Sequence, residues 1–406
     1  MLLEPGFGGL GYIEAVKKRG HELLVLTQRE ENPQERGYAH LLTDKIVVDF
    51  EDFKTLVNTL KANQHFSKIK AILPAMDENT HTASRLAGSL GFRAAPYEAI
   101  MAGRYKDIGR KVCKEKNIQT PQSIKVRTEK EARAAAHALG YPVILKPADG
   151  AGSAHVTLHN TETSLLEEVN LLSTVKTNYG YPVNGEFLIE EFIDGQEFSV
   201  EIFMWDSQVK FASVTEKHTT PPPCFVETLH VVPTALFKEE IPEIIHFAVS
   251  ALTAIGYSDG PAHVELKLST SGHYFLIEIN PRIGGDMIST DLLRISFGMN
   301  MHDAHICWAL EEPYPFPSSQ ALCATAISFL LAPTKGRLLK VAGWENLSQQ
   351  AGMVKHALFH KIGECVFPPT ENAERLGYLI CKGDTPHIAK EHVKSALESL
   401  SIEISS

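Results

Sequence analysis

One segment, residues 263–286, constrains the fold more than any other. Its sequence, HVELKLSTSGHYFLIEINPRIGGD, contains two runs of alternating apolar and polar residues separated by a Ser-Gly turn sequence. The two runs predict neighbouring β-strands. Because side chains alternate between the faces of a strand, Glu278 and Asn280 share a face. His263 and Glu265 share a face of the other strand for the same reason, so the segment predicts a sheet with polar groups gathered on one side.

The polar groups of this predicted pair of strands are suited to a divalent cation. Magnesium prefers oxygen ligands, and proteins commonly supply one or two carboxylates while nucleotide and water supply the rest. Glu265, Glu278 and Asn280 meet this demand, and we predict that they bind Mg²⁺ (or Mn²⁺). A buried carboxylate without a cation or a basic partner is strongly unfavourable. The alternative is an ion pair with Arg282 or Lys267.

The chain as a whole is expected to form several lobes of α/β and α+β character, because 406 residues exceed one ordinary core. Residues 1–95 alternate short apolar runs, such as ELLVLT and KIVVDF, with helical segments. This βαβ rhythm predicts a Rossmann-like lobe with a parallel sheet. Residues 96–193 are expected to form a smaller lobe with a linking helix. Residues 194–406 are expected to form a β-rich large lobe, whose C-terminal subdomain (about 310–406) carries no obvious chemistry.

The composition argues against several classes of partner. A formal net charge of −10, without a long Lys/Arg block, opposes binding to nucleic acid. No apolar stretch approaches the roughly 18 residues of a membrane span, and the N-terminal segment lacks the basic leader of a secretory signal. The six cysteines are scattered, without a CxxC pair, so reduced thiols are expected. We therefore expect a cytoplasmic protein, and a homodimer if it follows the commonest soluble assembly.

Three glycines near the N-terminus need a separate interpretation. Gly6, Gly8 and Gly11 spell GxGxxG after a short apolar run, which is typical of a dinucleotide-binding turn. The acidic residue that would hold a ribose hydroxyl is missing where the second strand should end, although Glu30 and Glu31 lie just beyond. We interpret the glycines as a tight strand-to-helix turn. A dehydrogenase built on them stays an alternative that NAD(H) binding would test.

Basic and small residues ahead of the predicted metal site are suited to phosphate. Lys146 lies at the end of the apolar run VILKP, and Lys106 begins a helical segment, so both ammonium groups are placed to reach phosphates. The sequence ADGAGSAH follows, and the backbone amides of such a loop can close over phosphate oxygens. The loop residues predicted to do so are Gly150, Gly152 and Ser153. Taken alone, the loop is more often a plain turn.

A candidate site for a nucleotide base lies in FLIEEFIDGQEF. Glu190 and Glu191 precede the apolar Phe192 and Ile193, an arrangement suited to hydrogen-bonding an adenine edge from main chain and side chain. The simpler interpretation is an ordinary strand followed by an Asp-Gly turn.

Taken in order, these segments resemble a known family. Lys106, VILKP, the Gly/Ser loop, LIEEFIDGQEFSVE, HVELKL and FLIEINPRIGGD resemble the ATP-grasp superfamily of carboxylate–amine ligases over nearly the whole chain. The sequence VTEKHTTPPPCFVETLHVVP, followed by EINPRIGGDMI, looks most like the L-amino acid ligases, bacterial enzymes that make dipeptides. The resemblance implies an ATP-grasp fold of three lobes, with ATP held between two α+β units.

The resemblance also implies roles for individual residues. Lys106 and Lys146 would contact the phosphates of ATP, and Glu197 would bind the ribose hydroxyls. The segment 190–193 would hold adenine. Arg282 would lie where the transferred phosphoryl group and the later oxyanion develop negative charge.

The amino-acid substrates have candidate partners in FVETLHVVP and its surroundings. A ligand with an ammonium group needs a carboxylate or another acceptor nearby, which Glu227 provides. We place His263 with Arg282 in the catalytic set. The predicted substrate residues are Glu227, His230, Lys217, Gly284, Gly285 and Glu78. A solvated or structural role stays open for each of them.

The predicted reaction is ATP-dependent amide formation between small-molecule substrates. A carboxylate, expected to belong to an amino acid, attacks the γ-phosphate of ATP, and an amine then displaces phosphate from the acyl phosphate. Positioning and charge neutralisation carry most of such catalysis. Two further alternatives stay open. A carboxylase or purine-pathway ligase would use the same ATP site with bicarbonate or a ribonucleotide, and a nucleotide-binding module would bind ATP without catalysis.

Overall fold

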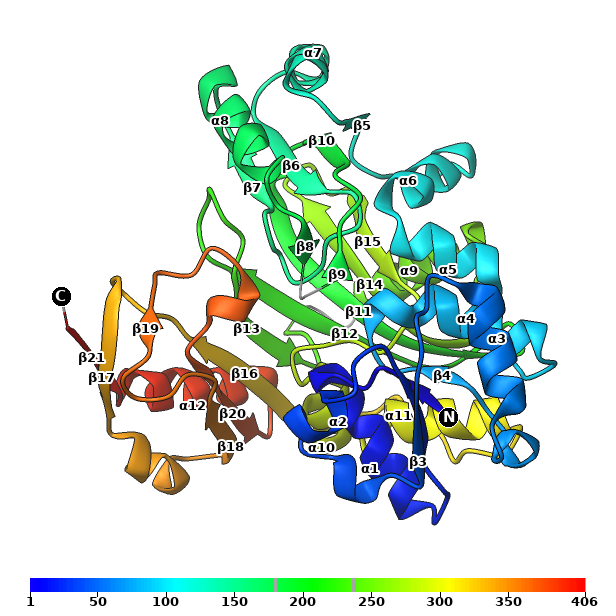
Figure 1. Ribbon diagram of the computed structural model, residues 1–406. Helices are drawn as coiled ribbons and strands as arrows, with labels where there is room; N and C mark the ends of the chain where they lie inside the picture. Colours follow the sequence, from blue (N-terminus) through cyan, green and yellow to red (C-terminus); the bar gives the residue numbers. More distant parts are fainter. Residues whose placement is uncertain (179–180, 236–238, 406) are drawn as a thin grey trace.

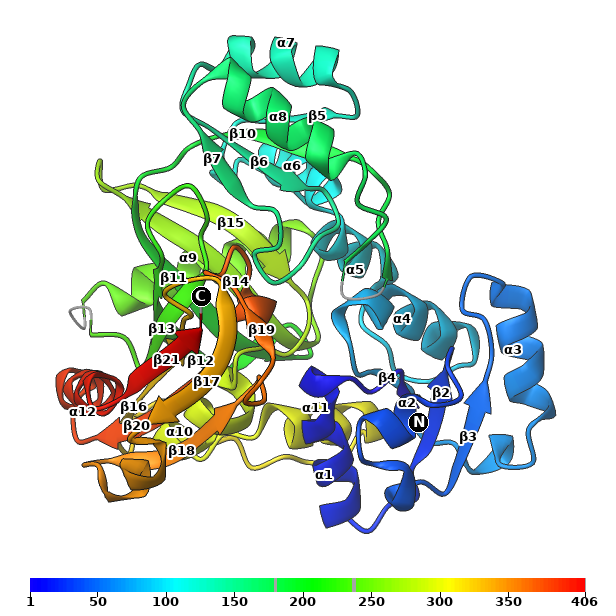
Figure 2. The same cartoon turned by 60° about the vertical axis from the view of Figure 1, so that its left-hand side comes forward.

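The structure, a computed structural model, describes residues 1–178, 181–235 and 239–405. A small four-stranded lobe stands above the rest of the molecule (Figures 1 and 2). Below it, the N-terminal lobe lies on the right of Figure 1, and the C-terminal strands, several of which belong to the long central sheet, lie on the left. Among the described residues, none of the helices has both the length and the apolar character needed to cross a membrane.

The N-terminal lobe contains the parallel sheet that the βαβ rhythm predicts. Its strands run in the order β3-β2-β1-β4, and every pairing is parallel. They are β1 (Leu2–Leu3), β2 (Leu24–Thr27), β3 (Asp44–Val47) and β4 (Leu73–Pro74). The helices of this lobe include α1 (Leu10–Lys18), α3 (Phe53–Ala62) and α4 (Thr80–Ser89). Leu3, Leu56 and Leu86 are buried together in its core, where each large apolar side chain contributes roughly 1.5–3 kcal/mol.

The GxGxxG glycines lie at the start of α1, and one of them is required by packing. Gly11 faces His302 in α11 (Met301–Leu310), and a Cβ on Gly11 would lie 2.6 Å from the imidazole ring. The neighbouring Tyr12 packs edge-on against the same ring, with 4.6 Å between ring centroids. Gly8, by contrast, has open space around it. Helix α1 can approach α11 this closely only because position 11 lacks a side chain.

The upper lobe is a four-stranded antiparallel sheet in the order β5-β10-β6-β7. Its strands are β5 (Ser123–Val126), β6 (Val143–Pro147), β7 (Thr157–His159) and β10 (Phe187–Glu191). Helices α7 (Glu129–Leu139) and α8 (Glu162–Leu172) pack on it through apolar side chains that include Leu165 and Val169. Thr128 caps α7 by accepting a hydrogen bond from the amide of Glu131, as the sequence predicts.

The central sheet has eight antiparallel strands in the order β15-β14-β11-β12-β13-β16-β20-β18. Strand β11 (Gly195–Trp205) shows how its two faces differ. Phe198, Val200 and Ile202 are buried against α9 (Ile241–Ala254). Glu197 and Glu201 lie on the opposite face because side chains alternate along the strand. The polar face of the sheet therefore lies on the side away from α9.

Strands β14 (Gly260–Ser269) and β15 (Tyr274–Asn280) confirm the predicted pair. They are antiparallel neighbours, with Glu265 opposite Glu278 and His263 opposite Asn280. Directly opposed residues share a face of a sheet. The register shifts just after Glu265, so Ile277 of β15 has no partner on β14. All four polar side chains therefore lie on one face, as the alternation predicts.

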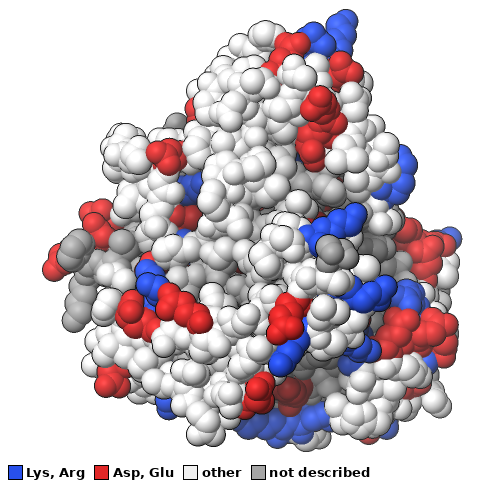
Figure 3. Space-filling view, turned by 90° about the vertical axis from the view of Figure 1, so that its left-hand side faces the viewer, with Lys and Arg blue, Asp and Glu red and all other residues white. Residues whose placement is uncertain are grey.

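The C-terminal region extends the central sheet and adds a smaller one. β13 (Glu227–Val232) is followed in the sheet by β16 (Ala324–Leu330), β20 (Gly377–Gly383) and β18 (Met353–Leu358). The smaller sheet contains β19 (Cys365–Val366), β17 (Gly336–Ala342) and β21 (Ser401–Ser405), and α12 (Pro386–Glu398) packs beside β20. On the face shown in Figure 3, basic and acidic side chains are interspersed among uncharged ones. A short helix, η7 (Asn372–Glu374), carries residues from this region to the cavity described below.

Candidate active site

A cavity of about 220 Å³ lies where the upper lobe, the central sheet and η7 meet. Most of the residues predicted from the sequence line it. They are Lys106, Lys146, Gly150, Gly152, Ser153, Glu190, Glu191, Phe192, Ile193, Glu197, Lys217, Glu227, His263, Glu265, Glu278, Asn280, Arg282 and Gly285. Three predicted residues, His230, Gly284 and Glu78, are not among those that line it.

The floor of the cavity carries the predicted metal ligands. Glu265 and Glu278 face each other across β14 and β15, and Asn280 lies two residues further on the same face. Lys217 Nζ lies 3.0 Å from Glu265, and Lys106 Nζ lies 3.3 Å from Glu278. Two carboxylates and an amide oxygen on one face are the donor set that Mg²⁺ prefers, so these residues fit a magnesium ion.

The ion pairs on this floor differ from the alternative that the sequence suggested. Glu265 and Glu278 pair with Lys217 and Lys106, whereas Arg282 pairs with another carboxylate, Asp77, at 2.9 Å.

The predicted phosphate-binding lysines flank the floor. Lys106 begins α6 (Lys106–Glu115), and its Nζ donates to the carbonyl of Gly150 at 2.6 Å, so it already contacts the glycine loop. Lys146 is the last residue but one of β6 and lies 2.5 Å from Glu190. Burial lowers the pKa of Lys146, although the carboxylate of Glu190 opposes this shift.

Arg110 is a site residue that the sequence reasoning missed. It lies one helical turn after Lys106, is buried, and binds Glu190 through two hydrogen bonds of 2.8 and 3.2 Å. Its guanidinium also donates to the carbonyl of Ile277, the residue left unpaired by the register shift. Burial would raise the pKa of Glu190, but Arg110 and Lys146 lower it to about 2. The i, i+4 spacing from Lys106 is the feature that would have placed Arg110 on the same helix face.

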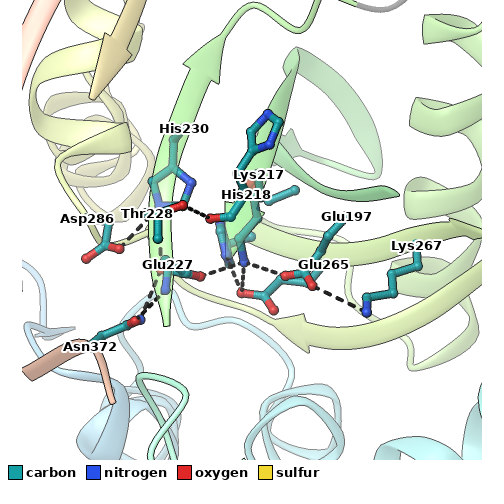
Figure 4. A network of polar contacts seen from close by, with 12 residues as sticks. Glu197, Lys217, His218, Glu227, Thr228, His230, Glu265, Lys267, Asp286 and Asn372 are labelled. Carbon is teal, nitrogen blue, oxygen red and sulfur yellow. Dashed lines mark hydrogen bonds and ion pairs between the residues drawn. The ribbon is translucent and has the colours of Figure 1, made fainter. Parts of the chain in front are cut away.

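A buried lysine lies at the centre of the polar network (Figure 4). Lys217, in β12 (Gln208–Thr219), is 2% exposed and pairs with Glu227 at 2.7 Å, Glu265 at 3.0 Å and Glu197 at 3.1 Å. Lys267 lies 3.9 Å from the other oxygen of Glu197. Burial would lower the pKa of Lys217, but the three carboxylates raise it well above its usual value. Lys217 therefore stays charged and holds together three carboxylates for which the sequence predicts different ligands.

A second cluster lies at the far end of this network. His230 Nε2 lies 3.4 Å from Glu227 and 3.2 Å from Asp286, and the register of β12 with β13 shifts beside Glu227. Arg375 binds both oxygens of Asp286, at 2.8 and 2.6 Å. Glu227, His230 and Asp286 are close enough together to hold a metal ion, because one ligand atom of each lies within 4.8 Å of those of the others. Lys217 and Arg375 already supply positive charge to their carboxylates, so we assign no metal there.

The C-terminal region therefore contributes to the site, contrary to the expectation that it carries no chemistry. Asn372 lines the cavity and hydrogen-bonds to Glu227, and Arg375 holds Asp286. Nothing in the local sequence of either residue marks it as a site residue, because the pairing of β20 with β16 is what brings Asn372 to the cavity and Arg375 to Asp286.

His263 is held between two carboxylates. Its Nδ1 lies 2.6 Å from Glu201 and its Nε2 lies 3.0 Å from Glu265. Burial would lower the pKa of His263, but Glu201 and Glu265 raise it to about 10. Gly284 packs directly behind this pair, and a Cβ there would lie 2.8 Å from His263 Nδ1. Gly284 thus has a packing reason to lack a side chain, and its substrate role stays a prediction.

The N-terminal lobe reaches the site through η4 (Asp77–Asn79). Asp77 Oδ1 lies 2.9 Å from Arg282 Nε. Burial would raise the pKa of Asp77, but Arg282 and Arg104 lower it to about 2. Glu78 is buried beside this pair, and its burial raises its pKa. The predicted substrate role of Glu78 stays a prediction, and its neighbour Asp77, which the sequence did not single out, is the residue that pairs with Arg282.

Comparisons with known proteins agree with this arrangement. Residues 139–291 match the ATP-grasp domain family, and residues 328–405 match the family described as L-amino acid ligase C-terminal domain 2. The uncharacterized protein y4rH of Sinorhizobium fredii is 25% identical over 98% of this chain and 81% of its own length. Alanine–anticapsin ligase of Bacillus subtilis is 27% identical over 52% of this chain, and the match spans 48% of that ligase.

Solved structures show the same fold. The crystal structure of L-amino acid ligase from Bacillus licheniformis superposes with a TM-score of 0.81 at 19% identity, covering 100% of this chain and 98% of that one. N5-carboxyaminoimidazole ribonucleotide synthetase from Thermotoga maritima gives 0.71 at 16% identity, covering 100% and 99%.

Together, the cavity, the two matched domains and the fold agree with the interpretation of the sequence. ATP-grasp enzymes use ATP with a divalent metal ion, for which the lysines and the acidic floor of this cavity are suited. This chain therefore contains an ATP-grasp domain followed by a C-terminal domain of the L-amino acid ligase type, the domain content of an ATP-grasp carboxylate–amine ligase.

Proposed function

We propose that this protein is an ADP-forming ligase that joins two amino acids into a dipeptide. It would phosphorylate the carboxylate of one amino acid with ATP and couple the acyl phosphate to the amino group of the other. One observation carries this proposal above all. The acidic floor, Arg282 and Glu227 line a single cavity, so that phosphoryl transfer and recognition of an ammonium group can take place side by side.

The nucleotide end of the cavity would position ATP. Lys106, Lys146 and the glycine loop would bind its phosphates. Glu265, Glu278 and Asn280 would hold Mg²⁺, which when bound neutralises charge on phosphate oxygens.

The adenine edge would be read chiefly by the main chain of residues 191–193. The carboxylate of Glu190 is already engaged by Arg110 and Lys146, at 2.8 and 2.5 Å. Because its carboxylate already has these two partners, a direct contact of Glu190 with adenine stays a prediction.

Arg282 would stabilise the charge that develops in both chemical steps. A guanidinium offers two parallel hydrogen bonds to phosphate or carboxylate oxygens. Asp77 holds the Nε edge of Arg282, and Nη1 donates to the carbonyl of Ile283 at 3.0 Å. These contacts orient the guanidinium before substrate arrives, which is the condition under which such a donor is most effective.

The amino-acid end would recognise an ammonium group through Glu227. Burial would raise the pKa of Glu227, but Lys217 and its hydrogen bonds keep it well below its usual value, so the carboxylate stays ionised. His230 and Asp286 lie directly behind it.

The first experiment is a screen of amino-acid pairs with MgATP, measuring ADP release and identifying products by mass spectrometry. Dipeptide should form together with ADP and phosphate. Arg282→Ala should lower the rate by roughly two to three orders of magnitude, because it removes a donor to the developing charge. Arg294→Ala, at an exposed arginine of α10 (Leu293–Phe297), is the matched control and should leave the rate unchanged.

The proposal fails if bicarbonate or a phosphorylated ribonucleotide, and not an amino acid, stimulates ADP formation. The assigned role of Arg282 fails if Arg282→Ala releases ADP at nearly the normal rate.

A further inference from the structure

We propose that Asn372 is a positioning residue that orients Glu227 for the amino-acid substrate and links it to the glycine loop over the phosphates. This inference rests on the proposed function and assigns a task in the reaction to the C-terminal domain. Three hydrogen bonds from one residue carry it, and they reach two functionally distinct parts of the cavity.

The side chain of Asn372 contacts Glu227 twice (Figure 4). Its Nδ2 donates to Glu227 Oε2 at 3.0 Å, and its Oδ1 accepts from the backbone amide of Glu227 at 3.0 Å. Lys217 holds the other oxygen, Oε1, at 2.7 Å. Both carboxylate oxygens are therefore fixed, Oε1 by Lys217 and Oε2 by the amide of Asn372, while His230 Nε2 lies 3.4 Å from Oε2.

The neutrality of this second partner matters for binding an ammonium group. A lysine or arginine in place of Asn372 would cancel the charge on Glu227, and a carboxylate there would repel it. An amide orients Glu227 without changing its charge. Asn372 thus restricts the rotation of Glu227 without adding to the positive charge that Lys217 already supplies, and a carboxylate fixed in advance lowers the entropy cost of binding.

The backbone of Asn372 makes the third contact. Its N–H donates to the carbonyl of Gly152 at 3.2 Å, in the loop predicted to close over the phosphates. Gly152 and Ser153 both have positive φ angles, of 67° and 57°, so this part of the loop has an unusual backbone shape that an anchor helps to maintain.

Arg375 fixes the turn that presents Asn372. Its Nε donates to the carbonyl of Asn372 at 2.8 Å, while its two Nη groups bind Asp286. The turn therefore cannot move away from the cavity without breaking a buried ion pair. Asn372 is placed by the C-terminal domain and acts on Glu227 and Gly152, without needing to touch the reacting atoms itself.

The test measures the KM values for the amino acid and for ATP separately. Asn372→Ala should raise the KM for the amino acid about tenfold and change the KM for ATP by less than about twofold, because it removes the side-chain contacts and keeps the backbone N–H. Asn372→Asp should raise the KM for the amino acid further, because a second negative charge faces Glu227. Asn346→Ala, at an exposed asparagine of η6 (Trp344–Gln349), is the control and should change neither value.

Asn372→Pro tests the contact with the loop. Proline removes the backbone N–H, and it is tolerated at the first position of a helical turn, where the preceding Glu371 is already extended with ψ of 166°. The affinity for MgADP, measured by calorimetry, should fall several-fold in Asn372→Pro and stay near the wild-type value in Asn372→Ala. If Asn372→Ala does not fold, Asn372→Ser takes its place.

The outcomes separate this inference from the proposed function. If wild-type protein shows no ADP release with any amino acid, the proposed function fails, while MgADP binding to the proline and alanine variants still tests the link to the loop. If wild-type protein is active and Asn372→Ala has the KM values of Asn346→Ala, the positioning role is overturned. Equal MgADP affinity in the proline and alanine variants overturns the link to Gly152.

Discussion

The two ends of the cavity are built in different ways. The acidic floor, which we propose to bind the metal ion, comes from one continuous segment, β14 and β15, in which Glu265 and Glu278 face each other across adjacent strands. The amino-acid end is assembled from β13, the loop after β15 and η7, and Asn372 lies 145 residues from its partner Glu227. The floor depends on local alternation and the amino-acid end on tertiary packing, so the first should tolerate changes elsewhere in the fold and the second should not.

The largest effect should follow from breaking the long-range anchor of the amino-acid end. Arg375 is 5% exposed and binds Asp286 through both Nη groups. Arg375→Met should lower the free energy of unfolding by roughly 3 kcal/mol, because it removes two charge-assisted hydrogen bonds to Asp286, a partly buried carboxylate that keeps its contact with His230. Urea unfolding would measure the loss. Arg337→Met, at an exposed arginine of β17, is the control, and equal stability of the two variants would contradict the distinction between the two ends.

A change at the metal floor should act on the rate and spare the fold. Glu278→Gln keeps the size of the side chain and removes a charged ligand, so the rate of ADP release should fall by roughly two to three orders of magnitude. Its melting temperature should stay close to that of wild type, because an amide oxygen at position 278 can still accept from Lys106, which also keeps its bond to the carbonyl of Gly150. Glu243→Gln, on the exposed side of α9, serves as the control. A large loss of stability in Glu278→Gln would show that the floor is not a local unit.

The buried pair of Glu190 and Arg110 predicts a dependence on pH. The pKa of Glu190 falls from 4.5 to about 2 on folding, so the unfolded chain binds the proton more readily. Its contribution to stability is present above about pH 4.5 and is lost as the pH falls toward 2, on the order of 3 kcal/mol for a shift of this size. Urea midpoints measured between pH 5 and 3 should fall less steeply for Glu190→Gln than for wild type. Urea midpoints that fall equally steeply with pH in both proteins would contradict the stabilising role of ionised Glu190.

The smallest effect should come from the register shift that shapes the amino-acid end. Thr228 donates from its hydroxyl to the carbonyl of His218 at 3.2 Å, beside the shift. Thr228→Val removes this hydrogen bond without changing the shape of the side chain, and should lower the free energy of unfolding by about 1 kcal/mol. The KM for the amino acid should rise more than the KM for ATP. Equal changes in the two KM values would mean that the register shift affects the sheet as a whole and not the amino-acid end in particular.

Sequence reasoning succeeded where neighbours in the chain are neighbours in space. The alternation in residues 263–280 placed the acidic floor, and the run VILKP placed Lys146 at the end of a strand. Alternation fails at the amino-acid end, where Glu227 and His230 are three residues apart and a regular strand would turn them to opposite faces. The register shift brings both beside Asp286, and no residue pattern announces it.

The residues that were missed share a physical cause. Arg110 and Asp77 act by neutralising a buried partner, and that partner becomes known only when the lobes are assembled. Buried ions need a counter-charge, so each buried acidic or basic residue at the site implied an unseen partner. The sequence indicated that such partners exist, and tertiary structure was needed to identify them.

The close approach of α1 to α11 has a consequence for how the glycine motif is understood. Helices α1 and α11 can lie this close because position 11 carries a hydrogen atom in place of a side chain. A methyl group there would overlap the imidazole of His302. One glycine of a spacing that suggests a coenzyme is thus explained by a steric limit, whereas Gly8 has open space around it. An alanine at position 11 would act as a wedge, and the first thing it would change is the angle between the lobes.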